Sequence, residues 1–484
     1  MSTRRRNIAI IGGGPGGLVS AREFLTTQQD GVPSFDRVVV FEQKDRVGGV
    51  WAFDPVPNDL DEQLLQRDYW DPKVIHPVVE PPSGIENASF EHPLNTEAIN
   101  LENQWAKSGI YPHLYTNVAK RFMRFSSIPF NESEEENVIS PLLTHKQVYS
   151  TLYKFAEDNK LFDHIRLQTQ VHSVEKSNDK WNLVLRHRAG DKDEWYSETF
   201  DAIVVATGHY STPYIPHIPG LETREAGSVS HSKSFRDVQK FEGKTVVIVG
   251  SSLSGIDIVQ YVEPVAKRLI ISRTPGKKEI YPWLERAADA SETKPRIKNV
   301  NGKTVTFNDG TTADVDHILI ATGYHWHWPF IGDKFMSVGD SNQTPTSASR
   351  VPGLYYNLFS TKHEGLGFIG VTLGATKFHS LEAGAASLAG VWSGAKQLPS
   401  KEEQLKWETD RVSIAGNGVL FHYYHFNNIK RDWFDEVIRN FAVPGRINPL
   451  DNEDITDMDR AIDMAEKLYF GVKSHDELYS EFQF

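Results

Sequence analysis

Two short runs of apolar residues, each closed by a glycine, stand out along the chain. Residues 8–12 are four apolar residues followed by a glycine, and residues 246–250 repeat this arrangement. Because no polar position alternates with the apolar ones, each run is typical of a strand buried on both faces in a parallel sheet. Apolar residues then recur at helical spacing over 18–25 and 256–265. The pattern therefore predicts a strand, a glycine turn and a helix at both places.

Other elements follow from the same patterns. Residues 144–158 have the spacing of an amphipathic helix. The further predicted strands are 37–41, 164–171, 174–175, 181–188, 202–205, 268–271, 305–310 and 318–320.

The remaining segments are less regular. Residues 54–140 are acidic and contain proline, which predicts an irregular region, and four glutamates over 131–137 predict a solvated loop within it. Residues 209–219 are rich in Pro and Tyr, as in a linker between domains. After Gly365 the abundance of Ala and Gly predicts a helix to about residue 393, followed by polar helices to the end.

The two strand–turn–helix units predict an α/β fold with two Rossmann-like dinucleotide-binding domains. We expect the second domain to be inserted in the first. The predicted boundaries are 1–210 for the first part of one nucleotide-binding domain, 211–324 for the inserted second domain, and 325–484 for the rest of the first domain with C-terminal helices.

Composition narrows the possible partners. The 484 residues carry a formal net charge of −12, which disfavours nucleic acid and anionic membranes as general partners. No apolar stretch approaches the roughly 18 residues of a membrane-spanning helix, so we expect a soluble, cytoplasmic protein. The chain has no cysteine, which excludes thiolate metal ligands and a redox-active dithiol. Its histidines show no metal-ligand spacing, and we expect no metal.

The first glycine turn has the spacing G-x-G-x-x-G at Gly12, Gly14 and Gly17, with Pro15 and Gly16 between them. Such a turn lets a pyrophosphate approach the backbone and the start of the following helix. The next predicted strand ends at Glu42, whose carboxylate can accept a hydrogen bond from a ribose 2′-hydroxyl. A tight turn without a ligand is the alternative, but the strand–turn–helix context favours nucleotide binding.

Gly49, Val50 and Trp51 follow this strand after a short loop. Glycines here would let the chain pass close to a flavin diphosphate, with an aromatic side chain nearby. This arrangement favours FAD over NAD at the first site.

The second turn departs from the usual spacing, because Ser252 stands where the middle glycine is expected. Serine is small enough to preserve the close approach, and we expect a dinucleotide contact at Gly250, Ser251, Ser252, Ser254 and Gly255.

The strand after this turn ends in Ser272, Arg273 and Thr274, without a carboxylate. An arginine and two hydroxyls suit a 2′-phosphate, which favours NADPH over NADH. Two such sites indicate hydride transfer from NADPH to FAD. Because there is no dithiol and no iron–sulfur or haem motif, O₂ or a diffusible acceptor must receive the electrons.

Several motifs in this order resemble the class B flavin-containing monooxygenases, most closely their soluble microbial and fungal branch. The residues concerned are the flavin motif over 42–51, the segment 114–120, and Ala-Thr-Gly hinges at 206–208 and 321–323. The family fingerprint is matched over 225–235.

The fingerprint match has two departures. Gly227, His231 and Phe235 are present, but Glu225 replaces the first Phe of the pattern. No Trp-Pro follows His231, so the Baeyer–Villiger version of the fingerprint is not met.

The resemblance implies that NADPH reduces FAD and that O₂ then forms a flavin C4a-hydroperoxide, from which a nitrogen or sulfur nucleophile takes one oxygen atom. It implies Asn117 as a catalytic donor beside the flavin, Tyr214 as a catalytic-site contact near NADP⁺, and His231 as a structural link between domains. Further cofactor contacts are expected at Thr116, Val171, Thr322 and Gly323. The family resemblance also allows a homodimer, which no residue pattern specifies.

Three alternatives stay open. A Baeyer–Villiger enzyme would act on a ketone, and an NADPH oxidase or flavin reductase would release peroxide. A nucleotide-binding scaffold would have no activity. Trp326, Trp328 and Phe330 after the second hinge are expected in the core, with a substrate funnel as the alternative.

Overall fold

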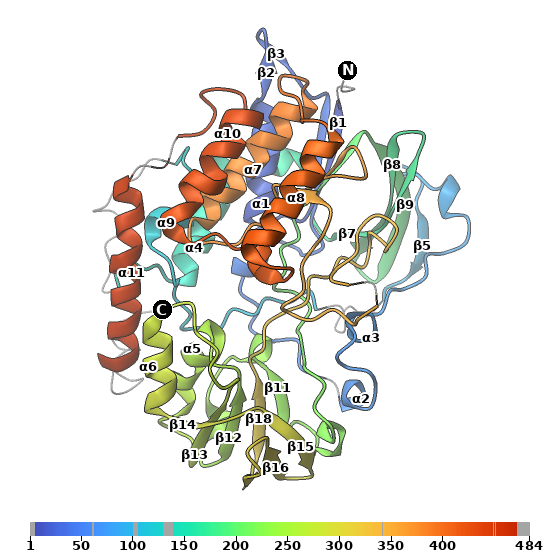
Figure 1. Cartoon of the computed structure of the whole chain (residues 1–484). Helices are drawn as coiled ribbons and strands as arrows, with labels where there is room; N and C mark the ends of the chain where they lie inside the picture. Colours follow the sequence, from blue (N-terminus) through green and yellow to red (C-terminus); the bar gives the residue numbers. More distant parts are fainter. Residues whose placement is uncertain are drawn as a thin grey trace.

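Two mainly parallel sheets form the centres of two lobes, one above the other in Figure 1. The computed structural model describes residues 5–60, 62–99, 105–128, 139–340, 342–448, 450 and 452–471. The upper lobe has a seven-stranded sheet of order β19-β20-β21-β10-β1-β4-β6, and the lower lobe a five-stranded sheet of order β11-β18-β12-β13-β14.

The strands are β1 (Asn7–Ile11), β2 (Gln28–Gln29), β3 (Val32–Pro33), β4 (Arg37–Phe41), β5 (Leu94–Glu97), β6 (Ile165–Arg166), β7 (Thr169–Ser177), β8 (Lys180–Ala189), β9 (Lys192–Phe200), β10 (Ala202–Val205), β11 (Val229–His231), β12 (Thr245–Val249), β13 (Arg268–Ser272), β14 (Glu292–Lys294), β15 (Ile297–Asn301), β16 (Thr304–Phe307), β17 (Thr312–Asp314), β18 (His317–Ile320), β19 (Leu354–Tyr355), β20 (Phe359–Ser360) and β21 (Leu366–Phe368).

The helices are α1 (Pro15–Thr26), α2 (Glu62–Leu65), α3 (Pro72–Ile75), α4 (His145–Asp158), α5 (Leu253–Val262), α6 (Pro282–Ala290), α7 (Lys377–Trp392), α8 (Lys401–Ala415), α9 (Phe426–Ile429), α10 (Asp435–Phe441) and α11 (Asn452–Gly471).

The upper sheet is centred on β1, which pairs in parallel with β4 on one side and β10 on the other. Ile8 to Ile10 are completely buried, as expected for a strand covered on both faces. β21 adds in parallel to β10, so the chain returns to this sheet after completing the lower lobe. The predicted fold class, with one nucleotide-binding unit inserted in the other, is confirmed.

All strands of the lower five-stranded sheet come from residues 229–320, and all their pairings are parallel. They lie within the unit predicted over 211–324. The boundaries themselves fall in the connections on either side of this sheet and stay predictions.

A four-stranded antiparallel sheet of order β5-β9-β8-β7 covers one side of the upper lobe. Strand β9 was not predicted, because its charged and aromatic residues do not alternate regularly. The region 54–140, predicted to be irregular, contains the short elements α2, α3 and β5. The acidic loop predicted over 131–137 lies outside the described residues.

Two helix boundaries also differ from prediction. Helix α7 begins at Lys377, not after Gly365, because residues 366–368 form strand β21. A glycine occupies position 367 of this strand because a Cβ there would come within 2.7 Å of the Leu388 side chain. Helix α5 ends at Val262 instead of residue 265. Helix α4 begins as predicted, with a capping box between Thr144 and Gln147.

Helix α11 runs along the side of both lobes in Figure 1. Near its start, Asp457 accepts a hydrogen bond from Arg121 of the upper lobe at 2.7 Å. Near its end, Glu466 accepts one from Arg286 of α6 in the lower lobe at 3.0 Å. The helix therefore connects the two lobes at a distance from the chain crossings between them.

Each glycine turn packs against the hinge that follows a neighbouring strand. A Cβ on Gly12 would lie 2.8 Å from the carbonyl oxygen of Ala206, at the first hinge. A Cβ on Gly250 would lie 2.5 Å from the carbonyl oxygen of Ala321, at the second. The same packing relationship thus occurs twice in the chain.

Candidate active site

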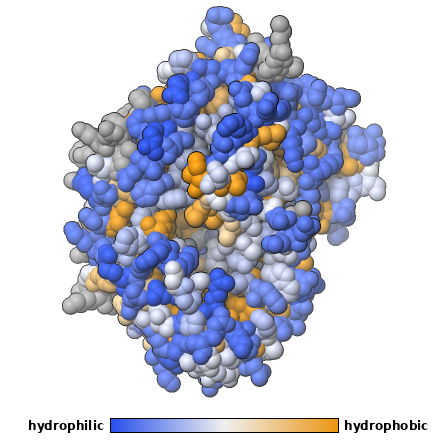
Figure 2. Space-filling view, viewed as in Figure 1, coloured by the Kyte–Doolittle hydropathy of each residue, from blue (hydrophilic) through white to orange (hydrophobic). Residues whose placement is uncertain are grey.

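A cavity of about 520 Å³ lies where the two lobes meet. Figure 2 shows this face of the molecule hollowed between the lobes, with apolar residues near the rim. The predicted site residues that line it are Gly12, Gly14, Pro15, Gly16, Glu42, Gly49, Val50, Trp51, Asn117 and Val171. Residues that the sequence separates by more than 150 positions therefore meet on one surface.

The first glycine turn leaves no room for side chains. Gly12 has φ of +103°, a left-handed conformation that favours glycine. A Cβ on Gly17 would overlap the carbonyl oxygen of Gly12, so Gly17 allows the helix and strand to pack and does not line the cavity. The start of α1 lines the cavity and presents the positive end of its dipole, which suits a diphosphate.

The carboxylate of Glu42 is buried at the end of β4. It accepts hydrogen bonds from the backbone N–H groups of Gly13 at 2.6 Å and Lys44 at 2.8 Å. Burial raises the pKa of Glu42, and these backbone hydrogen bonds lower it. Each carboxylate oxygen keeps a further lone pair, so the group can also accept from a ribose hydroxyl.

Asn117 is exposed and lines the cavity, and among the described residues its side-chain amide has no hydrogen-bond partner. The preceding residue, Thr116, is buried and lies outside the cavity lining. Its hydroxyl donates to the carbonyl of Val118 at 2.9 Å and accepts from the N–H of Leu143 at 3.0 Å. Thr116 therefore fixes the backbone that carries Asn117, and the amide of Asn117 faces the ligand space.

The second glycine turn lies at the lower-lobe side of the cavity. Leu253, the first residue of α5, lines the cavity, whereas Gly250, Ser251, Ser252, Ser254 and Gly255 do not. Gly250 has φ of +116°. The Ser251 hydroxyl donates to Glu279 at 2.7 Å. The sequence did not single out Leu253, because an apolar first residue of a helix carries no distinctive signal.

Polar groups collect where β13 ends, outside the cavity lining. Ser272, Arg273 and Thr274 lie there as predicted, and Arg273 forms an ion pair with Asp289 of α6. Arg296, which the sequence-based interpretation missed, donates to the hydroxyl of Thr274 at 2.8 Å. The N–H of Arg273 donates to the carbonyl of Lys294 at 3.0 Å, so both arginines lie at this end of β13, where two guanidinium groups suit a phosphate. Only the fold reveals this, because 23 positions separate the two arginines in the chain.

Hydrogen bonds join the two hinges. The N–H of Tyr214 donates to the carbonyl of Gly323 at 2.9 Å, and the Thr322 hydroxyl donates to the carbonyl of Tyr214 at 2.6 Å. His231 donates from Nε2 to the same Gly323 carbonyl at 3.1 Å, a contact that agrees with the structural role expected for it. Tyr214, Thr322 and Gly323 lie outside the cavity lining, and the Tyr214 ring packs on His325 at a centroid distance of 5.1 Å.

The segment after the second hinge alternates between core and cavity. Trp326 and Trp328 are buried in the core of the upper lobe, which confirms the expected packing. Phe330 lines the cavity instead, together with His325 and His327. Over 325–328 successive side chains of the extended segment point in opposite directions, so burying the tryptophans turns the histidines toward the cavity, and Phe330 reaches it after the turn at 329–330. The alternation was visible in the sequence, but its cavity face was not recognised.

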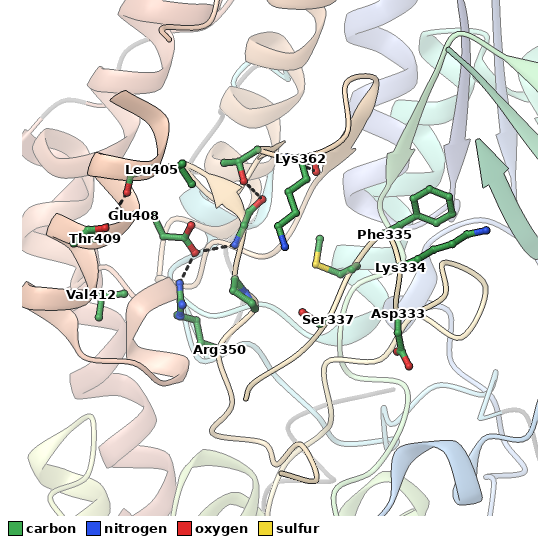
Figure 3. A pocket seen from close by; sticks show the side chains of 15 residues that line it. Asp333, Lys334, Phe335, Ser337, Arg350, Lys362, Leu405, Glu408, Thr409 and Val412 are labelled. Atoms are coloured by element: carbon green, nitrogen blue, oxygen red, sulfur yellow. Dashed lines mark hydrogen bonds and ion pairs between the residues drawn. The ribbon is translucent and has the colours of Figure 1, made fainter. Parts of the chain in front are cut away.

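A second pocket, of about 420 Å³, lies beside α8 and is lined by Arg350, Leu405 and Glu408 among others (Figure 3). Arg350 is paired with Glu408, which also accepts from the N–H of Gly353 at 2.8 Å. None of the predicted site residues lines this pocket. We therefore place the active site in the cavity between the lobes.

No group of three or more His, Cys, Asp or Glu residues in the described part of the chain is arranged to hold a metal ion. Within the same residues, no helix has the length and apolar character needed to cross a membrane.

Comparison with known proteins finds a flavin-binding family and a nucleotide-binding fold at the first glycine turn. The family model described as "Flavin-binding monooxygenase-like" matches residues 100–290 and 287–437, and that of an NAD(P)-binding Rossmann-like domain matches residues 10–66. A flavin-containing monooxygenase of Arabidopsis thaliana, FMO GS-OX-like 7, is 30% identical over 87% of this chain and 81% of its own.

Two further relatives support the comparison. A trimethylamine monooxygenase of Methylocella silvestris is 28% identical over 87% of this chain and 83% of its own. The structure of S-allyl-L-cysteine S-oxygenase from Allium sativum superposes with a TM-score of 0.69, covers 98% of this chain and 97% of its own, and is 23% identical. That structural similarity establishes the shared fold.

Proposed function

Since the chain belongs to the flavin-binding monooxygenase-like family and is an FAD- and NADPH-dependent enzyme, we propose that it transfers one oxygen atom from O₂ to a soft nitrogen or sulfur nucleophile. The observation that carries this proposal is the cavity between the lobes. The first glycine turn, Glu42, Trp51 and Asn117 line it from the upper lobe, and the start of α5 lines it from the lower lobe.

We assign the cofactors to these walls. FAD would be held with its diphosphate at the start of α1, its ribose at Glu42, and its ring system toward Trp51 and Asn117. NADPH would lie along the second turn, with its 2′-phosphate at Arg273 and Arg296. When bound, reduced FAD supplies the activation of O₂.

The protein's own contribution is to bind, orient and exclude water. Asn117 has an amide without a partner among the described residues, and this amide can donate to a group on the flavin or the nicotinamide. The cavity wall includes Phe330, Ile369 and Phe378, whose apolar surfaces limit the access of water. None of these groups is arranged to donate a proton, which agrees with a reaction driven by placement of the nucleophile.

Nitrogen and sulfur oxygenation are both represented among the similar proteins, by the trimethylamine monooxygenase and the S-oxygenase. The Baeyer–Villiger alternative is less well supported, because no Trp-Pro follows His231. Tyr214 packs at the hinge outside the cavity, so we propose that it supports NADPH binding through the hinge. The cytoplasmic location and the homodimer stay predictions.

The function can be tested with the purified holoenzyme and a panel of amines, sulfides and ketones under ¹⁸O₂. We expect NADPH oxidation to depend on an amine or sulfide, and one ¹⁸O atom to appear in the N-oxide or sulfoxide. Esters from ketones would establish the Baeyer–Villiger alternative. NADPH oxidation that yields only hydrogen peroxide with every compound would establish the oxidase.

A further inference from the structure

The cavity is lined by more positive than negative side chains. Lys107, Lys233 and Lys377 line it, and among the described residues none of them pairs with a carboxylate. The carboxylate in its lining, Glu42, already accepts two backbone hydrogen bonds. A protonated amine would meet like charge in this space, whereas an anion would meet opposite charge.

Three histidines form one side of the cavity, and we call them the imidazole wall: His76, His325 and His327. The rings of His76 and His327 have their centroids 5.4 Å apart. His325 is 1% exposed, and neither of its ring nitrogens has a hydrogen-bond partner among the described residues. The Nε2 atom of His327 is also buried without a partner there. Buried polar atoms without partners are uncommon, and these line a space large enough for a ligand.

The wall is electrically neutral and can donate hydrogen bonds. Burial lowers the pKa of His76 and His325 to about 3 and that of His327 to about 4. A neutral imidazole carries one N–H in either tautomer, so each ring can offer one donor to a ligand. Acceptor atoms of a ligand would satisfy the buried nitrogens that have no partner within the protein.

Lys233 adds a cationic donor next to this wall. Its Nζ atom donates to the carbonyl oxygens of Trp105 at 3.2 Å and Lys107 at 2.6 Å. Burial lowers the pKa of Lys233 to about 7. An ammonium has three N–H groups, so its protonated form keeps one for a ligand. The positive charge of Lys233 also acts on His76, which places the two groups in one electrostatic environment.

We propose that the imidazole wall and Lys233 bind a carboxylate of the substrate, and that the substrate is therefore a thioether that carries a carboxylate. This inference rests on the proposed function, and it selects sulfur over nitrogen. A carboxylate has only acceptor atoms, which match the donors of His325, His327 and Lys233. A thioether is uncharged at the reacting atom, whereas an alkylamine is protonated at neutral pH and meets the lysines.

The reaction is balanced with the reactants already assigned. The thioether R–S–R′ reacts with O₂, NADPH and H⁺ to give the sulfoxide R–S(O)–R′, NADP⁺ and water. Sulfur supplies the electron pair of the new S–O bond, NADPH supplies two electrons, and the second oxygen atom leaves as water.

Three thioethers of nearly the same size test the charge preference: 3-(methylthio)propionate, 3-(methylthio)propanol and 3-(methylthio)propylamine. We expect kcat/KM for the propionate to exceed that for the propylamine by about tenfold, the effect of one charge-assisted hydrogen bond. The difference should decrease with added salt. Calorimetric titration of the holoenzyme with pentanoate and pentylamine, in the presence of NADP⁺, gives the same comparison without turnover.

Replacing the wall tests the residues. In the double variant His325→Phe/His327→Phe, and separately in Lys233→Met, two preferences should disappear: that for 3-(methylthio)propionate over 3-(methylthio)propylamine in turnover, and that for pentanoate over pentylamine in binding. KM for NADPH should stay unchanged. His92→Phe, an exposed histidine outside the cavity, is the matched control. Retention of FAD shows whether each variant is folded, and the single variant His325→Leu, which also lacks a donor, replaces the double variant if that one loses FAD.

Two results would overturn the inference and leave the proposed function in place. The first is oxygenation of 3-(methylthio)propylamine as efficiently as of 3-(methylthio)propionate. The second is wall variants that raise KM for NADPH but keep the preference, because the wall would then bind the coenzyme. A failure of the proposed function looks different, since every compound would then yield only hydrogen peroxide.

Discussion

The guanidinium Nε of Arg296 lies 2.8 Å from the hydroxyl oxygen of Thr274, directly beyond Arg273 at the end of β13. The two arginines come from different strand connections and reach the same place through the fold. A phosphate bound there would be contacted by charge from two sides, which a single surface arginine cannot provide.

Arg273→Ala should raise KM for NADPH and leave KM for NADH nearly unchanged. The preference between the coenzymes should shift by about 1–3 kcal/mol, as for loss of a charged hydrogen bond. Steady-state kinetics with both coenzymes measures this shift. Asp289→Asn is the paired variant, because it removes the carboxylate that engages Arg273 and should lower KM for NADPH. Equal losses for both coenzymes would place the phosphate elsewhere.

Glu42→Gln should weaken FAD binding. The buried carboxylate accepts from two backbone N–H groups, and an amide would turn one donor toward another donor. We expect a loss of about 1–3 kcal/mol, or roughly 10- to 100-fold in the dissociation constant for FAD. Fluorescence titration of the apoprotein with FAD measures it. Glu194→Gln, on β9 outside the cavity, is the control, and unchanged FAD affinity in Glu42→Gln would contradict the assignment.

Acid should destabilise the fold through buried histidines such as His422. Its Nε2 accepts from the N–H of Val351 and its Nδ1 donates to Asn357, both at 2.9 Å. Burial, followed by the charges of Arg350 and Arg411, lowers its pKa to about 3. The unfolded chain binds a proton near pH 6.5 and the folded chain does not, so stability falls as the pH drops below 6.5.

Between pH 7 and pH 5 this one group should account for about 2 kcal/mol of lost unfolding free energy. His422→Asn should therefore show a smaller loss over this range than the unchanged protein, although it is less stable at pH 7. Denaturant titrations at both pH values measure the difference. His92→Asn should keep the pH dependence of the unchanged protein. If His422→Asn and His92→Asn lose the same unfolding free energy between pH 7 and pH 5, the explanation is refuted.

Asp457→Ala should loosen the connection that α11 makes between the lobes. The partly buried ion pair with Arg121 should contribute about 0.5–1 kcal/mol to the free energy of unfolding, more than an exposed ion pair would. Thermal unfolding measures the loss, and limited proteolysis should cut near α11 sooner. Asp410→Ala removes the exposed pair with Lys406 on α8 and should change stability by less. Equal effects of the two changes would show that α11 does not link the lobes energetically.

The sequence was most informative where one physical requirement dominates. Gly12 and Glu42 could be assigned to a nucleotide turn because an apolar strand, a left-handed glycine and a terminal carboxylate coincide there. Arg296 and Lys233 could not be found in this way, since their contacts are made across distant segments. Strand β9 was missed because its buried aromatic residues, Trp195, Tyr196 and Phe200, do not recur at every second position and have charged residues between them.

The packing of each glycine turn against its own hinge means that the two dinucleotide sites can be altered one at a time. A side chain at Gly12 would press on the backbone carbonyl of Ala206 and leave the second turn untouched, and one at Gly250 would press on the backbone carbonyl of Ala321 and leave the first turn untouched. Natural or designed variants could therefore change affinity for one dinucleotide without retuning the other. A rotation of one lobe against the other, by contrast, would change the packing of both glycine turns against their hinges at the same time.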